Sequence, residues 1–150
     1  MDDEQRGTDD AKKEDILWWK GTAGELIAIR VDSGATGGAY AVLEALHQPD
    51  CFVPLHLHRN EEEHFLVLEG RYRIAIGDRV IEAEPGDRAT VPKNTPHCWR
   101  NISSGQGRLL VVLTPGGFER LVSQDHDLPE EALIRQAAEY GCDILGPPTV

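Results

Sequence analysis

The chain alternates short apolar runs with turn-forming residues, and this pattern constrains its fold more than any other feature. Runs rich in Val, Ile, Leu and aromatic residues are interrupted by Gly, Pro, Asn or Asp throughout the region after residue 15. Short strands with frequent turns are typical of an antiparallel sandwich or barrel. No run precedes a helix long enough for a parallel crossover, which argues against an α/β fold. We therefore predict an all-β protein with strands at residues 25–31, 39–46, 53–58, 63–68, 72–76, 79–83, 88–91, 97–101 and 108–113.

Only the C-terminal part has helical periodicity, with apolar side chains recurring between residues 133 and 140. We expect Asp127 to cap the N-terminus of this helix, Pro129 to lie in its first turn, and Gly141 to end it. The expected organisation is a disordered acidic leader, a β-barrel domain, and a short helix with an extended tail packed on the barrel, over residues 1–15, 16–122 and 123–150 respectively.

The net charge of the chain argues against some classes of binding partner. The chain has 15 Lys and Arg residues against 26 Asp and Glu residues, a formal charge of -11. This argues against nucleic acid and anionic membranes, which attract basic patches. No apolar run approaches the roughly 20 residues of a membrane span, and the N-terminus does not resemble a secretory signal. The three cysteines, Cys51, Cys98 and Cys142, form no CxxC pair, which favours a reducing cytoplasm over a disulfide framework or zinc cage.

Three histidines and one glutamate form the most informative cluster of the sequence. His56 and His58 are two positions apart on an expected strand, so both rings lie on the same face. Glu63 starts the next strand, and His97 starts another strand after a proline-rich turn. This nitrogen-rich donor set suits one divalent transition metal (Fe, Mn, Ni, Cu or Zn) and leaves coordination positions open for water, substrate or dioxygen.

The other histidines lack such support. We expect His47 and His126 at the surface and His64 at the surface or at the rim of the pocket. Strand alternation turns Cys98 away from His97, so we expect it to be a small buried apolar residue.

Two segments resemble the paired motifs of the cupin superfamily. Residues 56–70 resemble the first motif, G-x5-HxH-x3,4-E-x6-G, and its spacing selects Glu63 over the preceding glutamates. Residues 86–101 resemble the second, G-x5-PxG-x2-H-x3-N. Two glycines of these motifs are replaced, by Asp50 and by Asn94. Both are turn positions, and Asn tolerates a left-handed backbone, so neither change affects a ligand position.

The resemblance to small, quercetin dioxygenase-like cupins implies a jelly-roll β-barrel, the cupin double-stranded β-helix, with the metal inside near one open end. Cupins of this kind usually form homodimers. Trp18 and Trp19 are candidates for the dimer surface, and the alternative is that they cover the outer sheet.

The same resemblance covers several activities, because fold alone does not select a reaction. The leading hypothesis is a metal-dependent oxygenase that acts on a small aromatic or dicarbonyl compound, with Glu63 as fourth ligand or as general base. The alternatives are a non-catalytic metal- or small-molecule-binding cupin and a redox-silent isomerase, lyase or cyclase. We expect Arg73 and Arg100 to face solvent. The candidate pocket walls are Tyr40, Phe65, Tyr72, Trp99 and Leu113.

Overall fold

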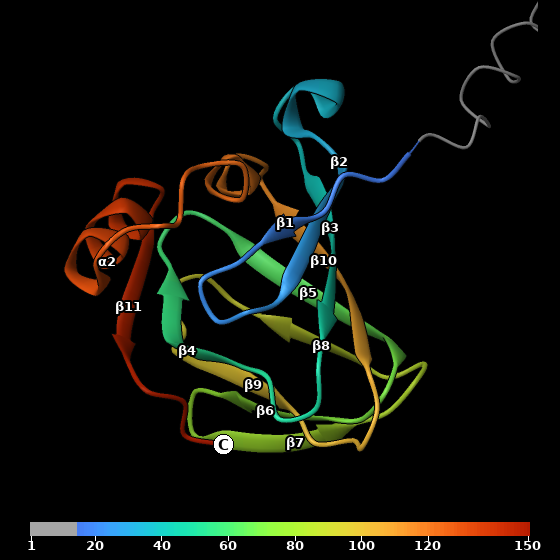
Figure 1. The fold of residues 1–150 in the computed structure, drawn as a ribbon. Helices are drawn as coiled ribbons and strands as arrows, with labels where there is room; N and C mark the ends of the chain where they lie inside the picture. Colours follow the sequence, from blue (N-terminus) through green and yellow to red (C-terminus); the bar gives the residue numbers. More distant parts are fainter. Residues whose placement is uncertain (1–14) are drawn as a thin grey trace, which may run out of the picture.

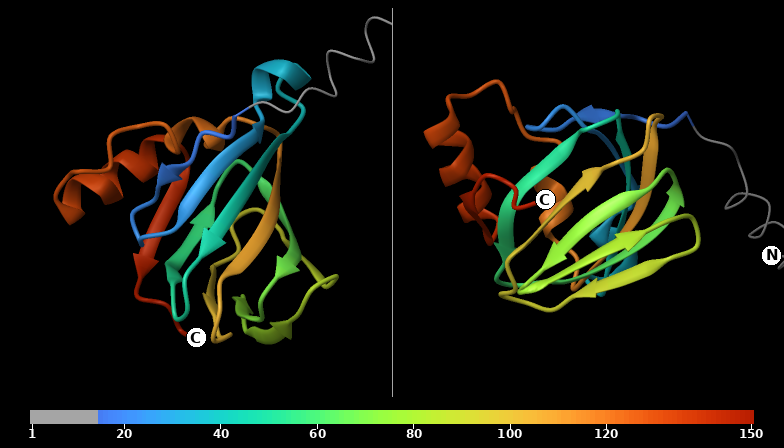
Figure 2. Two further views of the ribbon diagram at one scale, coloured as in Figure 1. Left: turned by 45° about the vertical axis from the view of Figure 1, so that its right-hand side comes forward. Right: turned by 90° about the horizontal axis from the view of Figure 1, so that it is seen from below.

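The computed structural model describes residues 15–150 and contains two antiparallel β-sheets that face each other (Figures 1 and 2). Most of the expected leader lies outside the described residues. In the first sheet the strand order is β1-β2-β3-β10-β5-β8, with bounds Trp19–Lys20, Leu26–Val31, Ala41–His47, Gly107–Thr114, Glu62–Glu69 and Arg88–Val91. In the second sheet the order is β11-β4-β9-β6-β7, with bounds Cys142–Gly146, Phe52–His58, His97–Asn101, Tyr72–Ile76 and Arg79–Ala83.

The core lies between the sheets, and strand alternation explains it. Strand β10 is central, pairing with β3 on one side and β5 on the other. Its residues alternate between buried and half-buried, so that Leu109, Val111 and Leu113 point into the core. Phe65 and Ile74, from opposite sheets, are buried in the same core cluster. The all-β prediction is therefore confirmed.

The expectation of a closed barrel needs correction. Within residues 15–150 no hydrogen-bonded ladder joins the two sheets, and each keeps two edge strands: β1 and β8 in one, β11 and β7 in the other. Strand alternation predicts a buried face equally well for an open sandwich and for a barrel, so the sequence could not distinguish them. The two packed antiparallel sheets are consistent with a jelly roll.

The C-terminal segment contains the predicted helix, α2 (Glu130–Glu139), together with a strand that was not predicted. Pro129 occupies the N-cap position, where no side chain makes a capping hydrogen bond, so the assignment of Asp127 as N-cap was wrong. The backbone N–H of Asp127 instead donates to Asp125. Gly141 follows the helix with φ of 80°, as expected for a residue that ends it. The chain then forms β11 along β4, where an extended tail was expected.

The remaining regular elements are two short 3-10 helices, η1 (Ser33–Thr36) and η2 (Phe118–Leu121). The buried Glu119 carboxylate accepts hydrogen bonds from the backbone N–H groups of Ser33 and Gly117, which ties η2 to η1. Among the described residues, no helix is both long and apolar enough to cross a membrane.

Candidate metal centre

The two sheets together bring four side chains to one point. His56 and His58 lie on β4 with one residue between them, so both face the interior. His97 begins β9 and pairs directly with His56 across the β4–β9 ladder. Glu63 comes from β5 in the opposite sheet. The site therefore requires both sheets to be packed.

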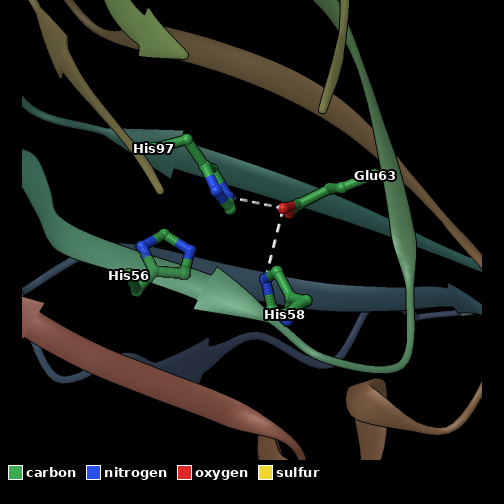
Figure 3. A group of neighbouring side chains, drawn as sticks. All are labelled: His56, His58, Glu63 and His97. Atoms are coloured by element: carbon green, nitrogen blue, oxygen red, sulfur yellow. Dashed lines mark hydrogen bonds and ion pairs between the residues drawn. The ribbon is translucent and has the colours of Figure 1, made fainter. Parts of the chain in front are cut away.

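The candidate ligand atoms of these four residues lie within 4.8 Å of one another, and all four residues are buried. The Oε2 atom of Glu63 is 2.8 Å from Nε2 of His97 and 3.2 Å from Nε2 of His58 (Figure 3). The ring of His56 lies beside them, with its centroid 4.1 Å from that of His97. The residues that the sequence singled out thus converge.

Backbone carbonyl groups fix the orientation of two of the rings. The Nδ1–H of His56 donates to the carbonyl of Pro54 at 2.7 Å, and that of His97 donates to the carbonyl of Thr95 at 2.9 Å. Because a carbonyl only accepts, each neutral ring then carries its lone pair on Nε2. In His97 this lone pair faces the Glu63 carboxylate, so a proton or a metal cation must lie between the two acceptors. Such an arrangement is typical of metal-binding histidines.

The charged states inside the cluster depend on one another. Burial raises the pKa of Glu63, but the charges of His58 and His97 and their hydrogen bonds outweigh it and hold this pKa well below its usual range. Burial lowers the pKa of His58, but Glu63 outweighs it, so the net shift is upward. Burial, together with the two neighbouring histidines, lowers the pKa of His56 to about 3. The centre therefore holds an ionised carboxylate and a neutral His56 over a wide pH range.

These donors fit a divalent transition metal. Three imidazole nitrogens and one carboxylate oxygen form a mixed donor set that favours first-row transition metals over Mg or Ca. The carboxylate is ionised and His56 is neutral, which are the forms that bind metals. Four ligands leave open positions on a metal that prefers five or six.

Sequence reasoning missed Glu61, which lies behind the cluster. Its Oε2 atom is 3.7 Å from Nδ1 of His58, and both residues are buried. Neither atom has a hydrogen-bond partner among the described residues. The ring of Phe118 packs edge-on against His58, with centroids 4.5 Å apart. The motif spacing excludes Glu61 as a ligand and gives no signal for a residue that acts through His58.

A cavity of about 810 Å³ adjoins the centre, and His56, His58 and Glu63 form part of its wall. Most of the wall is apolar, including Ile27, Leu43, Val53, Val111, Leu133 and Ile144. Its size suits a drug-sized ligand.

Of the five candidate pocket residues, only Trp99 lines this cavity. Phe65, Tyr72 and Leu113 are fully buried in the core behind it, and Tyr40 is exposed just before β3. The residues that line the cavity in their place come largely from the N-terminal hairpin and the C-terminal segment.

His47 is buried, so its placement at the surface was wrong. Trp99 donates its indole N–H to Nε2 of His47 at 3.2 Å, which leaves the ring proton on Nδ1 to donate to the Tyr72 hydroxyl at 2.8 Å. These partners lie 52 and 25 positions away in the sequence, so sequence position gave no signal of burial.

For the remaining residues, the predicted exposure agrees with the structure in some cases and differs in others. His126 is half-buried and lines the cavity, so its placement at the surface was also wrong. His64 is partly exposed and bonded to Thr90, and Cys98 is fully buried, as expected. Arg73 is partly exposed and paired with Glu82. Arg100 is half-buried, with its guanidinium 4.8 Å from the centroid of the Phe52 ring.

Two facing antiparallel sheets, in an arrangement consistent with a jelly roll, hold a buried His₃Glu cluster that forms a candidate metal centre. Residues 44–113 match the family model described as Cupin domain. The chain is a small cupin-domain protein.

Among known proteins, the chain is 31% identical over 103 residues to the quercetin 2,3-dioxygenase of Bacillus subtilis (strain 168). This match covers 68% of the chain but only 26% of that enzyme, so the chain spans about a quarter of its relative.

Two solved structures share the fold at low identity. A predicted oxalate decarboxylase from Thermotoga maritima has a TM-score of 0.60 and 18% identity, over 67% of this chain and 91% of that one. An RmlC-like cupin from Shewanella frigidimarina has a TM-score of 0.59 and 15% identity, over 71% and 89% of the two chains.

Proposed function

We propose that the protein is a metal-dependent cupin oxygenase that acts on a small aromatic or dicarbonyl compound. The observation that carries this proposal is the buried cluster of His56, His58, Glu63 and His97 in the wall of a largely apolar cavity. In that setting a substrate with adjacent oxygen atoms can reach the open positions of a metal while the rest of its surface contacts the apolar cavity wall. The similarity to a quercetin 2,3-dioxygenase supports the same class of substrate.

The chain's own residues have distinct tasks in this proposal. His56, His58 and His97 hold the metal, and the carbonyl groups of Pro54 and Thr95 keep two of the rings oriented. A bound Fe, Mn, Ni or Cu ion would supply Lewis acidity and, where redox-active, reactivity toward dioxygen. Glu63 is either the fourth ligand or the base that takes a proton from a substrate hydroxyl. Trp99 and its apolar neighbours position the substrate.

The first test is metal analysis of protein produced without added metal. Wild-type protein is expected to retain a divalent transition metal near one equivalent, and His58→Ala is expected to lose most of it. The matched control is His64→Ala, which removes a partly exposed histidine outside the cluster. An unchanged metal content in His58→Ala would remove the site from consideration.

The second test is oxygen uptake by Fe-, Mn- and Ni-loaded protein with flavonol and β-diketone substrates. Uptake that requires both substrate and the intact cluster supports the oxygenase. Turnover of the same compounds without oxygen, in Zn-loaded protein, would favour a redox-silent isomerase or lyase. A compound that stays bound and unchanged would favour a binding protein.

A homodimer is the further part of this proposal, with its interface at the β1 edge of the first sheet. Trp18 and Trp19 are half-buried there, and Leu17 and Leu26 are exposed. Aromatic and apolar side chains at a sheet edge favour association. Sedimentation of a monomer at micromolar concentration would contradict it. A cytoplasmic location and the domain boundaries at residues 15 and 122 stay predictions.

A further inference from the structure

The cavity beside the candidate metal centre has an unusual charge composition. Its lining includes the carboxylates of Glu25, Glu63 and Glu130 but contains no lysine and no arginine among the described residues. Glu63 belongs to the metal cluster, and Glu130 is exposed at the start of α2. Glu25 remains as a buried carboxylate in the cavity wall that the proposed metal chemistry does not use.

The hairpin between β1 and β2 places Glu25 in the cavity wall. Its side chain is folded back over the turn, where the Ala23 N–H donates to Oε2 at 3.0 Å. The carboxylate lies so close to Gly21 that a β-carbon at that position would clash with it. The residue is only 7% exposed, and it is flanked by apolar lining residues such as Ile27. Burial raises the pKa of its carboxyl group.

His126 approaches from the C-terminal segment and lines the same cavity. Its Nε2–H donates to the carbonyl of Val122 at 3.3 Å, which leaves Nδ1 as an acceptor. That Nδ1 atom is buried and has no hydrogen-bond partner among the described residues. In its protonated form, His126 would also lower the pKa of the Glu25 carboxyl group, against the larger effect of burial. An unpaired buried acceptor in the same cavity wall as a buried carboxyl group requires a donor to satisfy it.

From this arrangement we infer that Glu25 and His126 form a second polar subsite, which binds a neutral hydroxyl group of the ligand. The hairpin that carries Glu25 lies by the start of β4, where the Sγ of Cys51 donates to the Ala23 carbonyl, whereas His56 and His58 lie at the end of that strand. This inference rests on the proposed function in one respect only, namely that the other end of the ligand binds at the metal. A hydroxyl can both donate to His126 and exchange a hydrogen bond with Glu25. A carboxylate or phosphate at this end would meet the Glu25 carboxyl group, and the described cavity lining contains no lysine or arginine to neutralise it. The substrate class is thus a neutral, mainly apolar molecule with oxygen chelation at one end and a hydroxyl at the other.

Both subsite residues lie outside residues 44–113, the part of the chain that matches the cupin family model. The metal ligands lie inside it. The residues proposed to hold the metal and the residues proposed to select the ligand therefore come from different segments of the chain.

The test uses the whole chain loaded with Zn, because Zn is redox-silent and no turnover disturbs binding. The probes are 3-hydroxyflavone and its derivatives with a hydroxyl, a carboxylate or an aminomethyl group at the 4′ position, and the readout is the Kd from fluorescence titration. We expect the 4′-hydroxyl probe to bind at least tenfold more tightly than the 4′-carboxylate probe. Glu25→Gln should reduce this ratio below threefold, chiefly by improving carboxylate binding, whereas Glu131→Gln should leave it unchanged. Glu131 is exposed on α2 and does not line the cavity.

Equal binding of the two probes to wild-type protein, or an unchanged ratio in Glu25→Gln, would overturn the inference. Tighter binding of the aminomethyl probe than of the hydroxyl probe would overturn the neutral end group. If Glu25→Gln does not fold, His126→Leu provides the second variant, and it should abolish the preference for the 4′-hydroxyl probe over unsubstituted 3-hydroxyflavone. Absence of binding by all four probes to protein that holds Zn would also contradict the inference. If the protein shows the expected selectivity among the 4′ probes but consumes no oxygen, only the proposed oxygenase function would be contradicted.

Discussion

Nε2 of His97 lies 2.8 Å from Oε2 of Glu63, although the two residues belong to different sheets. The contact exists only when the sheets are packed face to face. A cation held between these atoms would therefore bind the folded chain and not the unfolded one, which links metal binding to the stability of the whole fold.

Metal addition is accordingly expected to raise the melting temperature of wild-type protein. At a free metal concentration 100 times the Kd, the gain in free energy of unfolding is about 2.7 kcal/mol. Glu63→Gln removes the charged ligand and should lose most of this gain, whereas Glu62→Gln, which changes a partly exposed neighbour, should keep it. The measurement is thermal unfolding with and without Zn or Ni. Equal metal-induced shifts in all three proteins would contradict a role for Glu63.

Glu61 is expected to support the site through His58. Its carboxylate faces Nδ1 of His58 at 3.7 Å in a buried position, where it can hold the ring oriented. Glu61→Ala should weaken metal affinity about tenfold, as is usual for a partner of a metal-bound histidine. Metal titration with a competing chelator measures this, with Glu62→Ala as the control. An unchanged affinity would show that Glu61 does not position His58.

Local sequence patterns were sufficient to predict most of the strands. The ranges expected for β6, β7, β8 and β9 coincide with those observed, because turn residues bound each strand on both sides. Motif spacing also singled out the four side chains that converge between the sheets. These features depend on neighbours in sequence, or on alternation along a single strand.

Long-range packing decided the features that were missed. β11 forms because the edge of β4 is available to it, and no local signal marks Cys142–Gly146 as its partner. His47 is buried because Tyr72 and Trp99 satisfy both its ring nitrogens. The cavity wall likewise combines segments from both ends of the chain. Each depends on contacts between distant segments, which alternation and turn chemistry do not encode.

Substitutions of Asn94 test whether the turn in the second motif requires a residue that tolerates a left-handed backbone. Its φ is 60°, in the left-handed region, where a side chain with a β-carbon costs roughly 1–2 kcal/mol and Asn is tolerated best. Asn94→Ala should therefore lower the free energy of unfolding by about 1 kcal/mol, and Asn94→Gly should not lower it. Urea denaturation measures both. A loss in Asn94→Gly as large as in Asn94→Ala would mean that the Asn side chain itself is needed.

Gly107 should tolerate no side chain, for a steric reason alone. A β-carbon there would clash with the Tyr72 hydroxyl and lie 2.7 Å from its Cζ atom, in a fully buried part of the core. Gly107→Ala should cost about 1–3 kcal/mol of stability. Tyr72→Phe in the same chain should recover part of this cost by removing the hydroxyl. A double-mutant cycle in urea measures the coupling, and strictly additive effects would contradict the proposed clash.

His47 is expected to make stability depend on pH. Burial lowers its pKa from 6.5 to about 4, and its Nε2 must stay unprotonated to accept from Trp99. Between these two values the unfolded chain binds a proton that the folded chain does not. The free energy of unfolding should therefore rise with pH from about 4 to about 6.5 and fall as pH decreases through this range. The contribution of His47 to this change is at most about 3 kcal/mol.

Carboxyl groups such as Glu25, whose pKa is raised by burial, also titrate at acidic pH. The contribution of His47 is therefore the difference between wild-type protein and His47→Gln, measured by urea denaturation at several pH values. The wild-type curve should be the steeper of the two between pH 4 and 6.5, and the curves should run parallel above that range. An NMR titration of the His47 ring in wild-type protein gives the same answer without a variant. A midpoint near 6.5 would mean that the buried pair with Trp99 does not exclude the proton, and the stability argument would fail with it.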